Sequence, residues 1–266
     1  MRRILAVITP LWHWRHLVAA LARREFRARY AGSVLGAAWA FLEPAVQFGL
    51  YLLVFSYFLG MRLEGRGSVG SFGFYLVGGM IPYLAFQESL VRAAGLARAN
   101  APVVRHVSVP LEALLAGTLL SVFVRHALAF ALVLGVAAVS GSLALAQLPW
   151  LAVGVAVLVA GTYGLTLLLV PAGAFLPDLV QVVTTVTTVL FFVTPIVYPP
   201  SALPAAARPW VLANPLVALL DTFRAGLVGL PVDPRRVAVA AGTAVLLMVL
   251  GAAVFGRRAA AARDIV

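Results

Sequence analysis

Long apolar stretches dominate this chain and restrict it to one class of fold. A helix needs roughly 20 apolar residues to cross the bilayer core of about 30 Å, and we expect about six such crossings. They are predicted at 35–59, 72–91, 111–139, 150–171, 180–198 and 236–256. Because 63% of the residues are hydrophobic and 11% are charged, little is left for a soluble domain. The sequence therefore predicts an all-α, polytopic membrane protein with a single membrane domain.

The basic residues predict the orientation of this domain. All 20 are arginines; 13 lie before the first span, after the second or after the last, and six lie in the segments expected on the opposite side: Arg62, Arg66, Arg208, Arg224, Arg235 and Arg236. With an even number of crossings the larger set shares one side, so both termini are expected in the cytoplasm. In this interpretation 1–34 form a cytoplasmic interface helix, 35–256 the membrane helices and 257–266 a cytoplasmic tail. The net charge of +11 then serves anchoring to anionic membrane lipids and not nucleic-acid binding.

Missing residue types exclude several chemistries. A phosphate-binding P-loop requires a lysine, which this sequence lacks, so the chain is not that kind of ATPase. The absence of cysteine excludes disulfides, thiolate metal sites and a cysteine nucleophile. His13 and His16 have no evident third ligand, so no metal site is predicted. Scattered acids such as Asp178, Asp221 and Asp233 include no paired arrangement that an enzyme acting on lipid-linked sugars would need.

The segment from Pro10 to Tyr30 is amphipathic. A helical projection places apolar side chains on one face and cationic ones on the other, which predicts a helix lying on the inner membrane surface. The apolar face comprises Leu11, Trp14, Val18, Leu21 and Ala22, and the polar face His13, His16, Arg23, Arg24 and Arg27. Its role is left open between a simple anchor and a platform for a cytoplasmic partner.

Two loops carry further signals. Pro102 and Pro110 bracket a short polar segment on the predicted cytoplasmic side, which is either a linker or an element that receives force from another protein. The proline-rich region 195–235 cannot be one continuous helix. Within it, Asn214 and Pro215 predict the N-cap and first turn of a helix to about Val228, too short to cross and therefore re-entrant or interfacial. Asp221 and Arg224 lie three residues apart on this helix and can pair.

Charged and aromatic side chains inside the spans are candidate functional residues. Glu43, Glu88 and Arg125 each cost about 2.5 to 3.5 kcal/mol if ionised and unpartnered at the bilayer centre. They are expected either to form an interhelical salt bridge, for example Arg125 with Glu43 or Glu88, or to face a hydrated conduit. Aromatic rings and threonines offer a second set, either as ordinary packing groups or as a conduit lining along which sugar rings slide. This set is Tyr51, Phe55, Tyr57, Phe58, Tyr83, Thr184 and Thr188.

Five strings, in order along nearly the whole chain, resemble the permease subunit of type-2 ATP-binding-cassette exporters. They are RARYAGSVLGAAWAFLEP (27–44), YLLVFSYFLG (51–60), LPDLVQVV (176–183), TPIVYPPSALP (194–204) and NPLVALLDTFR (214–224). They are most similar to the branch that exports lipid-linked polysaccharides such as O-antigen, teichoic acid and capsule. This chain has Glu43-Pro44 where many relatives have Asn-Pro, a form seen in capsule exporters, and Pro177 where a basic residue often precedes the aspartate.

The resemblance implies a homodimer in the bacterial cytoplasmic membrane, paired with two copies of a separate ATPase subunit that holds ATP and Mg. The permease itself would then carry no cofactor and catalyse no reaction. Two elements would contact the ATPase: an interface helix with Arg23, Arg24, Arg27 and Arg29, and a coupling helix with Asn100, Val103, Val104, Arg105 and His106. The alternatives are a type-2 exporter of a lipid or drug, and a membrane-embedded enzyme of lipid-linked sugar metabolism.

Overall fold

A computed structural model describes residues 12–61, 71–102 and 109–265, and every regular element in these ranges is helical. The all-α prediction is therefore confirmed for the described residues. The elements in chain order are α2 (Arg15–Tyr30), η1 (Gly36–Ala38), α3 (Trp39–Tyr51), the π-helical η2 (Leu52–Phe58), α4 (Ser71–Ala99), α6 (Leu111–Val139), η3 (Leu145–Gln147), α7 (Leu148–Phe175), α8 (Leu179–Val193), η4 (Pro200–Ala202), α9 (Arg208–Leu212), α10 (Pro215–Val228) and α11 (Pro234–Ile265).

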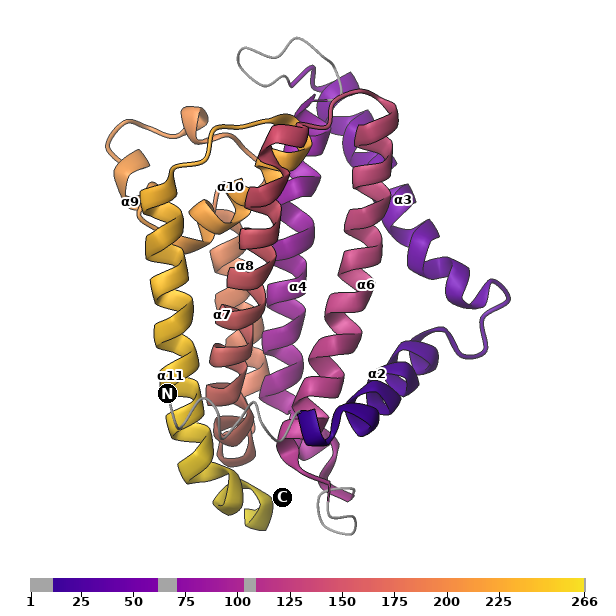
Figure 1. Ribbon diagram of the computed structural model, residues 1–266, viewed down its shortest axis with the longest axis vertical. Coiled ribbons are helices and arrows are strands. Elements are labelled where there is room, and N and C mark those ends of the chain that lie inside the picture. The colour runs from indigo at the N-terminus through magenta and orange to yellow at the C-terminus, as the bar shows by residue number, and fades with distance from the viewer. Residues whose placement is uncertain (1–11, 62–70, 103–108, 266) are drawn as a thin grey trace.

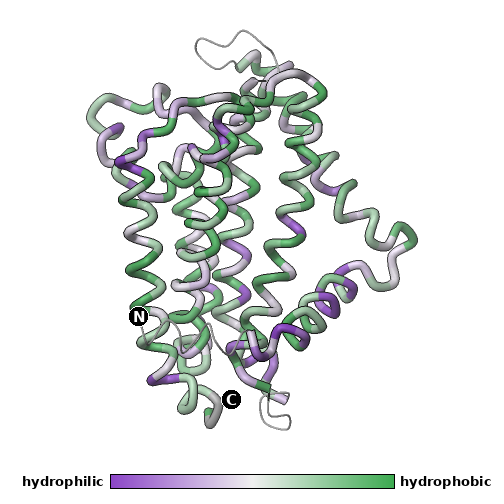
Figure 2. Tube along the Cα trace, in the orientation of Figure 1, coloured by the Kyte–Doolittle hydropathy of each residue, from purple (hydrophilic) through white to green (hydrophobic). Residues whose placement is uncertain are grey.

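Helix α4 is the centre of the bundle. It packs against α6, α7, α8 and α10, and Figure 1 shows it between α6 and α7, with α11 on the far side of α7. From Ser71 to Met80 every residue of α4 is buried, so its first half faces protein on all sides. The long helices are hydrophobic along most of their length, and hydrophilic residues concentrate on α2 (Figure 2).

Small residues allow α7 and α11 to cross closely. A Cβ atom added at Gly251 would lie 2.1 Å from the carbonyl oxygen of Gly164, and one added at Gly164 would lie 2.4 Å from the Met248 nitrogen. Neither position has room for a side chain. Close backbone approach at small residues is the usual basis of helix association in membranes, where apolar burial gives little driving force.

The N-terminal helices α2 and α3 lie at the edge of the bundle, beside α6. In Figure 1, α3 leans away from α6 and α2 runs back toward the opposite end of the bundle. Helix α2 packs on α6, where a Cβ atom added at Gly117 would lie 2.7 Å from Leu21 Cβ. Ala22 is buried and Arg23, Arg24 and Arg27 are exposed, as the predicted amphipathic faces require, whereas Trp14 of the predicted apolar face is exposed.

Four helical stretches among the described residues are long and apolar enough to cross a membrane. They are Gly36–Phe58, Leu111–Val139, Leu145–Phe175 and Pro234–Ala262, which matches four of the predicted spans. Helix α4 is long enough but less apolar, because it carries several glycines together with Gln87, Glu88 and Arg92. The chain is therefore a multi-pass membrane protein, and the count of six crossings stays a prediction.

The predicted span 180–198 is wrong at its C-terminal end. Helix α8 ends at Val193, and its 15 residues measure about 22 Å at 1.5 Å per residue. Thr194 is extended, with φ −80° and ψ 132°, because the following Pro195 disfavours helical backbone in the residue before it. By contrast, residues 257–265 of the predicted tail continue α11.

The short helix predicted after Asn214 is confirmed. The Asn214 side chain accepts a hydrogen bond from the Leu216 amide at 3.0 Å, Pro215 occupies the first turn, and α10 ends at Val228. Gly229 follows with a left-handed φ of 62°, a conformation that glycine adopts without steric cost. Helix α10 is buried along most of its length against α4, α7 and α11, so the proline-rich region ends in a packed element.

Candidate functional site

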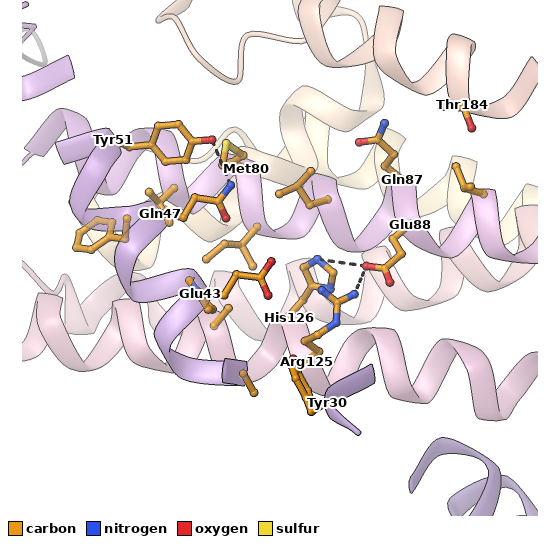
Figure 3. Close-up of a pocket in the computed structure, with 18 residues that line it drawn as sticks. Tyr30, Glu43, Gln47, Tyr51, Met80, Gln87, Glu88, Arg125, His126 and Thr184 are labelled. Carbon is orange, nitrogen blue, oxygen red and sulfur yellow. Dashed lines mark hydrogen bonds and ion pairs between the residues drawn. The ribbon is translucent and has the colours of Figure 1, made fainter. Parts of the chain in front are cut away.

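A polar groove lies between α3, α4 and α6, with Tyr30 of α2 and Thr184 of α8 at its margins (Figure 3). Its volume is about 400 Å³. Half of the 18 residues that line it are polar or charged, although the surrounding helices are strongly apolar. The lining includes Tyr30, Glu43, Gln47, Tyr51, Gln87, Glu88, Arg125, His126 and Thr184. Several residues singled out in the sequence as intramembrane charges or conduit residues therefore converge here.

Helix α3 contributes one polar face of the groove. Glu43, Gln47 and Tyr51 recur every fourth residue, so they share a side of the helix. The Gln47 amide donates a hydrogen bond to the Tyr51 hydroxyl at 3.3 Å. Glu43 makes no ion pair with any residue in the described ranges, and its carboxylate points across the groove toward His126 in Figure 3. An unpaired acid within a span is costly, which favours a hydrated groove.

The opposite wall is organised around Glu88. Its carboxylate pairs with Arg125 of α6, and its Oε1 atom accepts from Arg92 Nε at 3.0 Å and lies 3.8 Å from Arg29 Nη1. The predicted interhelical salt bridge of Arg125 is therefore formed with Glu88, one of its two predicted partners. Three arginines from three helices share one carboxylate, which compensates part of the cost of placing these charges away from water.

Sequence reasoning missed the extension of this network to α2. Glu25 faces the bundle from α2, where its Oε2 atom accepts from Arg92 Nη1 at 3.0 Å and its Oε1 atom accepts from the Thr118 hydroxyl at 2.7 Å. Glu25 is an acid among four arginines on an otherwise cationic helix. This lone negative charge was the sequence feature that could have indicated an ion pair with the bundle. Together with Arg29, it connects the surface helix to α4 and α6.

A second polar cluster surrounds Arg224 of α10, which has no exposed surface. The guanidinium donates to the carbonyl oxygens of Tyr75 at 3.0 Å, Pro195 at 2.8 Å and Ile196 at 3.1 Å. Its Cζ atom lies 3.8 Å from the centre of the Tyr75 ring. The predicted pairing with Asp221 is confirmed, at 3.3 Å.

Gly79 makes room for this cation, because a Cβ atom added there would lie 2.5 Å from Arg224 Nη2.

The remaining predicted conduit residues divide by exposure. Tyr57 and Phe58 are 72% and 66% exposed, whereas Tyr83 is 1% exposed and donates to the Thr187 carbonyl. Phe55 packs against the rings of Tyr51 and Phe72. Thr184 and Thr188 donate to the carbonyls four residues earlier in α8, at 2.8 Å each, which is the usual use of threonine in a helix.

Among the predicted partner-coupling residues, Arg23, Arg24, Arg27 and Arg29 lie on α2. Asn100 follows the end of α4, where its side chain donates to the Leu96 carbonyl at 2.9 Å. Val103, Val104, Arg105 and His106 lie outside the described residues. No group of three potential metal ligands occurs in the described ranges, and His13 and His16 belong to no such group there.

The fold and the groove define a class: a polytopic, all-helical membrane protein with a polar groove among its spans. Residues 16–228 match the family described as ABC-2 type transporter, so the chain belongs to that family. It is a membrane permease and not an enzyme, and permeases of this family pair with ABC ATPase subunits. The family implies no cofactor site on this chain.

Several relatives of known assignment align with most of the chain. It is 27% identical over 224 residues to the O-antigen export system permease protein RfbA of Myxococcus xanthus, covering 84% of each chain. It is 26% identical over 208 residues to the polysialic acid transport protein KpsM of Escherichia coli, covering 78% of this chain and 79% of the relative. It is 21% identical over 246 residues to RfbA of Klebsiella pneumoniae, covering 91% of each.

Proposed function

We propose that this chain is the transmembrane subunit of an exporter that moves a lipid-linked polysaccharide, of O-antigen, teichoic acid or capsule type, across the bacterial cytoplasmic membrane. The observation that carries this proposal is its alignment along most of its length with permeases named for O-antigen export and polysialic acid transport. The polar groove among the spans supports it, because a sugar chain requires hydrogen-bonding groups and water on its way through an apolar bilayer.

The proposal includes a particular assembly. Two copies of the permease pair with two copies of the ATPase subunit, with both permease termini in the cytoplasm and α4 and α8 completing six crossings. The exposed arginines of α2, with Asn100 and the segment that follows it, contact the ATPase. Exposed Tyr57, Phe58 and Thr188 are available at the boundary between copies, whereas Tyr51 and Thr184 line the groove.

Deletion of the gene tests the cargo. Cells that lack the permease should accumulate a lipid-linked glycan on the cytoplasmic side and lose the corresponding polymer from the surface, because synthesis continues while export stops. Extraction of lipid-linked glycans and surface staining measure both, with the wild-type gene on a plasmid as the control. A deletion strain with normal surface polymer but altered lipid distribution or drug sensitivity would favour the lipid or drug exporter.

A further inference from the structure

The attachment of α2 to the bundle combines two different kinds of contact. The helix packs on α6 through apolar residues such as Leu21, which lies against Gly117. Its links to α4 are ion pairs: Glu25 with Arg92 at 3.0 Å, and Arg29 with Glu88 at 3.8 Å. A displacement of α2 therefore reaches α4 through charged side chains.

Arg92 is the branch point of these links. Its Nη1 atom donates to Glu25 of α2 and its Nε atom donates to Glu88 of α4, both at 3.0 Å. Glu88 lines the groove and is held from the other side by Arg125. One guanidinium thus connects the surface helix with the charged wall of the groove.

The strength of these pairs suits reversible exchange. The side chains of Arg92 and Glu25 are 34% and 33% exposed, and pairs with that access to water stabilise a structure only weakly. Glu88 has further arginine partners, Arg29 and Arg125, so it need not lose all its compensation when one pair breaks. A movement of α2 withdraws Glu25 from Arg92 and Arg29 from Glu88. Arg92 then pairs with Glu88 alone, and the charge balance at the groove wall changes.

We propose that Arg92 is a positioning residue that couples α2 to the groove: it ties Glu25 to Glu88, so that ATP-driven movement of α2 redistributes the ion pairs around Glu88. This inference rests on the proposed contact between α2 and the ATPase subunit. Such coupling requires that the ATPase contact on α2 and the groove both depend on how the same residues are arranged. The Glu25–Arg92–Glu88 chain provides that connection.

The cysteine-free sequence permits a direct test that needs no cargo. Gln47→Cys places a single thiol in the groove, and its rate of reaction with a small methanethiosulfonate reagent is measured in the complex with the ATPase, with and without ATP. We expect ATP to change this rate at least threefold. Arg92→Ala in the same background should reduce the change to less than half, because only the longer Arg29–Glu88 contact then links α2 to Glu88. It should also lower export per ATP hydrolysed at least threefold, while the complex still assembles and hydrolyses ATP.

Further variants separate coupling from a purely structural role. Glu25→Gln, which keeps the side-chain volume, should reproduce Arg92→Ala, and the double variant should be no worse than either single one. Arg92→Lys should recover much of the ATP response. Arg258→Ala, at an exposed arginine of α11, should leave the response intact. If the Arg92→Ala permease fails to assemble with the ATPase, the ATP response of the Glu25→Gln variant tests the inference instead.

The inference is overturned if ATP leaves the reaction rate of the parent Gln47→Cys chain unchanged, if Glu25→Gln leaves the response to ATP undiminished, or if the two single effects multiply in the double variant. An ATP-dependent rate that requires Arg92, in a complex that exports no polysaccharide, would instead refute the proposed cargo and leave the coupling intact.

Discussion

Replacing Arg224 by Met should remove most of the folded permease from the membrane. The substitution removes the donor to the Ile196 carbonyl at a buried position and leaves the Pro195 carbonyl with the Tyr75 hydroxyl alone, at 3.3 Å. It also leaves Asp221 without its partner on α10. Loss of one partner from a buried charged cluster costs about 3 to 5 kcal/mol, a large part of the stability of most proteins. The segment after α8 would lose the strongest of its links to α4 and α10, and would keep the weaker ones through the Tyr75 hydroxyl and the Asn214 side chain.

The amount of monodisperse protein after detergent extraction, and its thermal unfolding, measure this effect. Arg208→Met is the matched control, because Arg208 also donates to backbone carbonyls, of Ser201 and Leu203, but is exposed. It should behave like the wild type. Equal yield and unfolding temperature for the two variants would show that the Arg224 cluster does not hold α4, α8 and α10 together.

Replacing Glu88 by Leu should have the second largest effect. The change leaves Arg29, Arg92 and Arg125 close together without the carboxylate that they share. Because about a quarter of the Glu88 side chain is exposed, we expect a loss near the lower end of the range for buried pairs, about 3 kcal/mol. The repulsion should also displace α2 and α6 from α4, so export should fall to background.

Glu43→Leu is the control for this second prediction. It removes an acid from the same groove, but Glu43 has no ion pair in the described part of the chain. The Glu43→Leu variant should therefore be as stable as the wild type or more stable. Unfolding temperatures of the two purified variants give the comparison. A Glu43→Leu variant that is as unstable as Glu88→Leu would mean that the groove tolerates no loss of charge, whichever partners the acid has.

Features that depend on local sequence were predictable. The apolar lengths of α6, α7 and α11 led to helices close to those observed, because a membrane span is set by composition over about 20 residues. The cap of α10 followed from Asn214 and Pro215, and the Asp221–Arg224 pair from spacing on that helix. Arg125 was predicted to pair with Glu43 or Glu88, and nothing in the sequence distinguishes between these two partners.

Features that depend on distant contacts were not predictable. Tyr75 is 149 residues from Arg224, and nothing local indicates that a backbone carbonyl of α4 receives its guanidinium. Glu25 and Arg92 are separated by 67 residues, so only the packing of α2 on α6 brings them together. The end of α8 at Val193 is a local feature that could have been predicted, because Pro195 stands two residues later in the sequence. The apolar residues around Pro195 led instead to a predicted span that continued to 198.

The most direct test of the central claim uses purified permease and its ATPase subunit in inside-out vesicles supplied with lipid-linked polysaccharide. The account predicts that the polymer becomes protected inside the lumen only when ATP, Mg and both subunits are present. Protection by the permease alone without ATP, or none with the complete complex while ATP is hydrolysed, would contradict it.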